Sequence, residues 1–468
     1  MPVVAAVLGL AALVWAAIAA HRVSLLVGCG LLLVVSYALG HEFWHQRVGP
    51  LPITLDRLLL LGLLAAFVVQ LRIGAFTLRQ MTGADWALVA LLSVLAVSAT
   101  LSGQPEITDG VTSKWGRLVA SFMLPAVLYF VIRQLPITYR DWSRMLVALV
   151  ALGVYLACTG VFEVAGLWSL VFPRYIADPN LGIHFGRARG PDLNSVSLGF
   201  YLTACCLCAW TLLPRAQQRW QQLALFGAGP LMAFGVLLTY TRSTWIGFAA
   251  SALVVAAFQI PRTWRMPAVI GGALVGLLFV AVSWSSLMGL KREGTAEDAE
   301  HSVGQRASFA YVSWHMFQDH PIFGVGFGRF YDQKLPYLSD RSQQVELESI
   351  RGLHHHNTLL SLLTETGMIG LAAFVAVFVA WGLSAWRLAV NVSASPWIRA
   401  QGVLMLALIA NYLCSAVFHD LTLLPSQELL LFVFAALTVN LQQATARVTA
   451  PAGVIRPLAW HGRPLSSP

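Results

Sequence analysis

Apolar runs of about twenty residues recur along most of the chain, and short polar connections separate them. Each run is long enough to cross the hydrocarbon core of a bilayer as a helix. A helix satisfies its backbone polar groups within the segment, as a membrane-spanning segment must. The pattern therefore predicts an all-α, polytopic membrane protein with about 12 transmembrane helices. Candidate spans begin near Val3, Val23, Ile53, Asp85, Leu118, Met145, Leu193, Leu223, Ser243, Ala268, Thr358, Ala400 and Ser426, and the short first two can form one hairpin.

One long polar interval, Lys291 to His356, interrupts the apolar pattern. Loops of this length are usually functional or disordered, and the many aromatic residues in this one favour a folded segment. Ser302 to Asp319 has helical periodicity, with Phe309, Val312 and Met316 on one face. We expect this stripe either to pack inside the protein or to rest on the membrane surface.

Composition supports the membrane class and gives an orientation. Hydrophobic residues make up 57% of the chain and charged residues 11%, whereas a soluble domain has about 25% charged residues. Arginine-rich connections alternate along the chain, which predicts that they all lie on the cytoplasmic face. These arginines are Arg72, Arg79, Arg133, Arg140, Arg144, Arg215, Arg219, Arg262, Arg265, Arg387, Arg399 and Arg447.

The opposite face carries more basic residues than this orientation rule predicts. Arg242 lies between two spans with almost no loop, where a guanidinium is costly unless it has a partner or an aqueous cavity. A single such residue is explained by snorkelling or by pairing with an internal acid. The whole set instead indicates an anionic ligand such as pyrophosphate, because arginine binds phosphate oxygens bidentately. The set consists of Lys114, Arg117, Arg174, Arg187, Arg189, Arg242 and Arg306.

Three consecutive histidines, His354 to His356, precede Asn357 at the start of an apolar run. Adjacent side chains do not converge easily on one ion, so we predict no metal site here. Asn357 is a suitable N-cap for the following helix. The positive end of that helix disfavours an imidazolium, so His356 should stay neutral near pH 7 and be able to act as a general base. The alternative is a histidine that only stabilises the loop.

Three further features of the sequence bear on the site. The glycines in Gly324-Val325-Gly326-Phe327-Gly328 follow no predicted strand, so a dinucleotide loop is excluded. They predict either a tight turn after Pro321 or a functional loop, which is a cradle of backbone amides or a close approach of the backbone to a sugar. Glu365 and Asp420 each either pair with an arginine or assist in the site. The chain has no Asp-x-Asp motif, so we expect arginines rather than a metal to neutralise a diphosphate.

Taken together, these motifs resemble the O-antigen ligase family, within the ligase and polymerase superfamily of bacterial envelope polysaccharides. The resemblance covers roughly Phe185 to Asp420, and the order of its motifs carries it. The motifs are Arg189-Gly190-Pro191 with Asn194, Thr241-Arg242-Ser243, Arg306 with Trp314 and the run His320 to Gly326, and His356-Asn357 with Gly367.

The resemblance implies a fold of the membrane glycosyltransferase C type and a metal-independent, inverting transfer without a cofactor. The implied donor is a polysaccharide on undecaprenyl diphosphate, and the implied acceptor is a sugar hydroxyl of lipid A–core. By analogy His356 is the base, and Arg242 and Arg306 bind the diphosphate. Further implied substrate-binding residues are Lys114, Arg187, Arg189, Asp420, Asn357 and His355.

This resemblance also fixes the expected location and organisation. We expect a multi-pass protein of the bacterial inner membrane with its site on the periplasmic face and no nucleic-acid partner.

A polymerase with the same donor is one alternative, and a transporter of lipid-linked oligosaccharides is another, although no inverted repeat is evident. The expected divisions are transmembrane helices over 1–289, a periplasmic catalytic loop with short helices over 290–356, C-terminal transmembrane helices over 357–443 and a cytoplasmic tail over 444–468.

Overall fold

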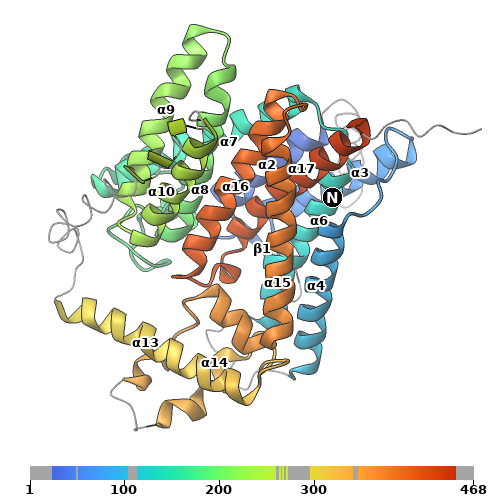
Figure 1. The fold of residues 1–468 in the computed structure, drawn as a ribbon. Helices are drawn as coiled ribbons and strands as arrows, with labels where there is room; N and C mark the ends of the chain where they lie inside the picture. Colours follow the sequence, from blue (N-terminus) through green and yellow to red (C-terminus); the bar gives the residue numbers. More distant parts are fainter. Residues whose placement is uncertain are drawn as a thin grey trace, which may run out of the picture.

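The computed structural model describes residues 24–48, 51–103, 113–259, 263–264, 266–267, 270–271, 296–340 and 346–449. These residues are mostly helical, as the hydropathy pattern predicts (Figure 1). The exception is one hairpin, in which β1 (His45–Val48) pairs antiparallel with β2 (Leu51–Thr54). The predicted spans near Val3 and Ala268 begin outside the described residues.

Within the described residues, eight helices are long and apolar enough to cross a membrane. They confirm the spans predicted near Asp85, Leu118, Met145, Leu193, Leu223, Thr358, Ala400 and Ser426. They are α4 (Gly83–Leu101), the continuous run of α5 (Lys114–Arg117), η1 (Leu118–Met123) and α6 (Leu124–Gln134), α7 (Tyr139–Val164), α8 (Ser195–Leu212) with η4 (Leu213–Arg215), α9 (Arg219–Leu238), α15 (Thr358–Val390), α16 (Pro396–Ala416) and α17 (Pro425–Thr449).

Three further predicted spans are helices that are not among these eight. The span near Val23 is α2 (Leu25–Ala38), which has 14 residues. The other two, α3 (Leu55–Arg72) and α10 (Arg242–Gln259), have 18 residues each and carry charged or polar ends. The total of 12 spans therefore stays a prediction.

Small residues let the helices of the bundle approach closely. A Cβ on Gly402 of α16 would lie 2.5 Å from the carbonyl oxygen of Ala385 in α15, so only glycine fits there. Gly247 of α10 is packed equally tightly against Asn411 of α16. Close backbone packing of this kind drives helix association in a bilayer, where burying apolar surface gains little.

A second layer of short and long helices lies across one end of the bundle (Figure 1). Phe309, Val312 and Met316 of α13 are buried in the core of this layer, so the predicted stripe packs inside the protein. The helix predicted from Ser302 is confirmed and begins earlier, at Ala296. The layer consists of α13 (Ala296–Asp319), α14 (Phe330–Gln333), η5 (Leu335–Ser339) and η6 (Leu347–Ile350).

The long helix α15 is interrupted at Gly367, where φ is 63° and ψ is −163°. Its 33 residues would extend about 50 Å, which is longer than the hydrocarbon core. The segment from Pro321 to Gly326 fills the interruption: the amide of Val325 donates to the carbonyl of Thr364, and the amide of Met368 donates to the carbonyl of Pro321, both at 2.9 Å. These hydrogen bonds at the interruption thus hold the helical layer against α15.

This packing shows what the glycine motif does. A side chain on Gly324 would overlap the backbone of Glu365, and one on Gly367 would overlap the carbonyl of Ile322. The amide of Gly326 is also engaged, since it donates to the carbonyl of Glu365 at 2.9 Å. Of the two predicted alternatives, the structure has the tight turn, and two of the amides that a cradle would need bind α15 instead.

Described arginines of the predicted arginine-rich connections lie at the other end of the bundle, where Arg79 contacts Asn440 and Arg215 contacts Pro396. Arg133 of α6 is 1% exposed there and donates to both carboxylate oxygens of Asp85 in α4, each at 2.8 Å. This pair fastens α6 to α4, so Arg133 does not reach toward lipid headgroups. Which end faces the cytoplasm stays a prediction.

Candidate active site

The candidate site lies at the end of the bundle that carries the helical layer, where several helix ends and loops meet. His419, in the connection between α16 and α17, links these segments. Its Nε2 lies 2.7 Å from Oγ of Ser243, the residue after Arg242. Burial lowers the pKa of His419 to about 3, and repulsion by the protonated forms of His356 and His184 and by Arg306 adds to this shift. Thr358, two residues after His356, donates to the carbonyl of His419 at 2.9 Å, and the guanidinium of Arg306 lies 5.7 Å from the ring centroid of Phe418. Arg306, His356 and the turn that carries Arg242 therefore share one region of the molecule.

His356 is the exposed member of the histidine run. Its ring packs edge-on against Phe309 of α13, with ring centroids 5.1 Å apart. Loss of solvent and the charge of Arg306 lower the pKa of His356, while Asp420 opposes this shift. A neutral imidazole near pH 7 follows, as predicted, with desolvation and Arg306 as its physical causes.

The two other histidines of the run have different surroundings. His355 is buried, its Nε2 lies 2.7 Å from Oγ of Ser313, and its ring stacks on Phe309. His354 is half-buried beside the ring of Tyr331, 5.0 Å away. Exposure therefore singles out His356 as the histidine that a substrate can reach.

Asn357 is confirmed as the N-cap of α15. Its Oδ1 accepts a hydrogen bond from the amide of Leu360 at 2.9 Å. Its Nδ2 donates to the carbonyl of Val417 at 2.9 Å, which ties the start of α15 to the end of α16. Both ends of the amide thus serve to position the segment that carries His356.

Arg242 and Arg306 are exposed cations on this face. Arg242 is the first residue of α10, and the guanidinium of Arg306 lies 5.7 Å from the ring centroid of Phe418. Arg187 is half-buried in the loop between α7 and α8. Exposed guanidiniums near a neutral imidazole give a site where an anionic group and a hydroxyl can be bound side by side.

Arg189 is placed differently from these exposed arginines. It is 1% exposed and donates to the carbonyls of Ile176 at 2.8 Å, Asp178 at 2.6 Å and Leu181. Its guanidinium also lies 4.8 Å from the ring of Phe185. These contacts hold the loop between α7 and α8 folded, so a direct contact with a diphosphate would require breaking them.

Lys114 is likewise buried, with 3% of its surface exposed. Its Nζ donates to the carbonyl of Ala99 at 2.8 Å, to Oγ of Ser102 at 3.3 Å and to the carbonyl of Gly103. The side chain therefore fastens the start of α5 to the end of α4.

Arg117 belongs to the basic set that the sequence predicted to bind an anion, but its partners within the protein were missed. It is buried and donates to Glu365 at 2.7 Å, to Asp420 at 3.3 Å and to Oγ1 of Thr422 at 2.9 Å. Oδ1 of Asp420 also accepts from Oγ1 of Thr422 at 2.6 Å. Both acids therefore pair with an arginine, one of the two alternatives left open for them. The network fixes α15 against the connection that carries His419.

A second group missed in the sequence joins the loop between α7 and α8 to the turn before α10. Nδ1 of His184 lies 2.8 Å from Oγ of Ser195, which lies 3.0 Å from Oγ1 of Thr241. His184 has φ of 64°. Burial and the charges of Arg187, Arg189 and His356 lower its pKa to about 4. No spacing in the sequence connects these residues.

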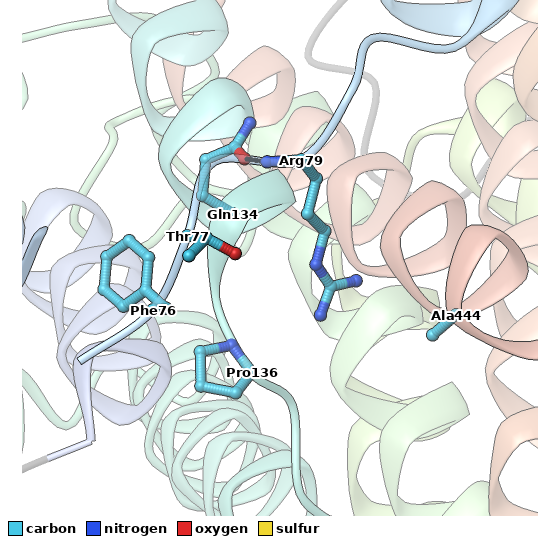
Figure 2. Close-up of a pocket in the computed structure, with 6 residues that line it drawn as sticks. All are labelled: Phe76, Thr77, Arg79, Gln134, Pro136 and Ala444. Carbon is cyan, nitrogen blue, oxygen red and sulfur yellow. Dashed lines mark hydrogen bonds between the residues drawn. The ribbon is translucent and has the colours of Figure 1, made fainter. Parts of the chain in front are cut away.

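A pocket of about 430 Å³ lies away from the candidate site and is lined by Phe76, Thr77, Arg79, Gln134, Pro136 and Ala444 (Figure 2). The amide of Arg79 donates to Oε1 of Gln134 at 2.6 Å across it. The pocket is found where α4 begins and α6 and α17 end, whereas the candidate site is found at their opposite ends. It contains none of the predicted site residues.

The apolar helices and the helical layer across one end of them define an integral membrane protein. The family described as O-antigen ligase matches residues 227–375, which include Arg242, Arg306, His356 and the glycine motif. The resemblance to this family is thereby confirmed. The chain is also 24% identical over 225 residues to the exopolysaccharide production protein ExoQ of Rhizobium meliloti (strain 1021). That match covers 46% of this chain and 49% of ExoQ, about half of each.

Proposed function

We propose that this protein is a membrane glycosyltransferase of the O-antigen ligase type. It transfers a polysaccharide from undecaprenyl diphosphate to a sugar hydroxyl of lipid A–core, on the periplasmic face of the bacterial inner membrane. The observation that carries the proposal is the grouping of an exposed, neutral His356 with Arg306 and the turn that carries Arg242.

His356 is the general base in this reaction. Its neutral imidazole takes the proton of the acceptor hydroxyl while the hydroxyl oxygen attacks the anomeric carbon of the donor. The new bond forms on the side opposite the diphosphate, and the bond from the anomeric carbon to the diphosphate oxygen breaks. The products are an inverted glycosidic bond and free undecaprenyl diphosphate.

Arg306 and Arg242 stabilise the diphosphate as it leaves. The leaving oxygen gains negative charge in the transition state, and guanidiniums already in place there lower the barrier. Both side chains are exposed at the site, so phosphate oxygens of the donor can reach them. The reaction needs no divalent cation in this scheme, so a chelator should leave the rate of the purified enzyme unchanged.

A second candidate function is polymerisation, in which the acceptor is another lipid-linked chain instead of lipid A–core. The observation that favours it is the similarity to a protein named for exopolysaccharide production. The donor, the base and the arginines have the same roles in both reactions, so only the acceptor differs.

Reconstitution of the purified protein in liposomes distinguishes the candidates. The lipid-linked donor is supplied with lipid A–core, with a second lipid-linked chain, or with neither. Polysaccharide on lipid A–core supports the ligase, and longer chains on the carrier lipid support the polymerase. Movement of the donor across the bilayer without a covalent product would mean a transporter and would overturn the proposed function.

A further inference from the structure

The inference concerns His184, which the roles proposed above do not use, and it rests on the proposed function. His184 lies in the loop between α7 and α8 and is half-buried. Its Nδ1 contacts Ser195, whose Oγ contacts Thr241, the residue before Arg242. Oγ1 of Thr241 in turn donates to the carbonyl of Thr239 at 2.9 Å. Three side chains thus form one continuous chain of hydrogen bonds.

The end of this chain fixes the direction of every hydrogen bond in it. The carbonyl of Thr239 only accepts, so the single hydroxyl proton of Thr241 points to it. Thr241 must then accept from Ser195, which uses the only hydroxyl proton of Ser195. Ser195 therefore accepts from His184, so Nδ1 of His184 carries a proton.

The remaining nitrogen of His184 is consequently a bare acceptor. The low pKa of His184, about 4, means that the imidazole is neutral near pH 7, so Nε2 has no proton. Nε2 has no hydrogen-bond partner among the described residues and is not one of their fully buried polar atoms. A ligand at this atom must donate a hydrogen bond. Phosphate oxygens are acceptors, so a hydroxyl fits and a diphosphate does not.

The position of His184 indicates which hydroxyl this is. The turn that carries Thr241 also carries Ser243, whose Oγ lies 2.7 Å from Nε2 of His419. The carbonyl of His419 accepts a hydrogen bond at 2.9 Å from Thr358, two residues after His356. The imidazole thus lies near the proposed base, where the acceptor sugar has to bind. We propose that Nε2 of His184 accepts a hydrogen bond from a second hydroxyl of the acceptor sugar and so positions that sugar beside His356.

Two variants separate this role from a structural one. In His184→Asn the amide can replace Nδ1 as the donor to Ser195, and asparagine tolerates the positive φ, but no acceptor is left at the position of Nε2. In His184→Gln the longer side chain can return an acceptor to that position. His184→Asn should raise KM for the acceptor about tenfold with little change in kcat or in KM for the donor, and His184→Gln should restore most of the loss.

Each outcome in the reconstituted transfer assay is informative. The inference is overturned if His184→Asn matches the wild type while His184→Gln is impaired, because the bond to Ser195 is then the only role of His184. A rise in KM for the donor alone also overturns it, since the hydroxyl would then belong to the donor. If the wild-type protein forms no glycosidic product, the proposed function itself fails.

Discussion

Arg117 donates to the carboxylate of Glu365 at 2.7 Å, although 248 positions separate them in the chain. Both side chains are almost completely buried, with exposures of 5% and 3%. The pair joins α5 to the first part of α15, a few turns from His356. Removing one partner leaves a buried charge with less compensation, which is far more costly than losing a surface pair.

Replacing this acid should therefore destabilise the fold. We expect Glu365→Gln to lower the free energy of unfolding by about 3–5 kcal/mol, seen as a fall in the melting temperature of the purified protein in detergent. Glu348→Gln is the matched control, because Glu348 forms an exposed pair with Arg351 at 2.7 Å. The control should melt like the wild type. Equal effects of the two substitutions would mean that the buried network does not hold this end of the protein.

The interruption of α15 gives a second prediction. Gly367→Ala should destabilise the protein by about 1–3 kcal/mol from its backbone conformation alone, since φ of 63° with ψ of −163° suits only glycine. Overlap with the carbonyl of Ile322 adds to this cost. Gly382→Ala in the same helix meets no atom within 4 Å and should be neutral or slightly stabilising. Thermal unfolding of both variants compares them, and a well-tolerated alanine at 367 would contradict the packing described for the glycine motif.

The pH dependence of transfer follows from the lowered pKa of His356. A base acts in its neutral form, so kcat/KM should rise with pH to a plateau, with a midpoint below about 6.5, the ordinary pKa of histidine. The charge of Arg306 contributes to that lowering. Arg306→Gln should therefore move the midpoint to higher pH in addition to reducing the plateau. A midpoint that stays in place would show that Arg306 does not act on the base.

Arg242 and Arg306 should bind the diphosphate through the geometry of their guanidiniums as well as through their positive charge. Arg242→Lys and Arg306→Lys keep the charge but lose the planar pair of donors that binds two phosphate oxygens. We expect kcat/KM for the lipid diphosphate donor to fall about tenfold or more in each variant. Arg351→Lys, in the exposed pair with Glu348, should leave this value unchanged. Full activity of both lysine variants would mean that charge alone suffices.

Hydropathy and local signals predicted the parts of the fold that depend on neighbouring residues. The confirmed spans and the helix ending at Asp319 follow from periodicity, and the N-cap at Asn357 follows from residue type at a helix start. The two 18-residue helices α3 and α10 show the limit of such signals, because their polar ends leave their span status open.

Long-range contacts could not be predicted in the same way. The partners of Arg117 lie 248 and 303 positions away, and His184 meets Thr241 only through Ser195. The sequence showed an excess of basic residues on one face but not which of them are exposed. The structure separates Arg242 and Arg306, which are accessible, from Arg189, whose donors are used within its own loop.

The central claim is that His356 removes the acceptor proton while the exposed arginines hold the diphosphate. The most direct test is single-turnover transfer by reconstituted His356→Ala, with donor binding and melting temperature measured on the same sample. His355→Ala serves as the control, because His355 is buried against Ser313 and its loss should lower stability more than chemistry. We predict that His356→Ala binds donor and melts like the wild type but forms no glycosidic product. Transfer at the wild-type rate by His356→Ala would contradict the account.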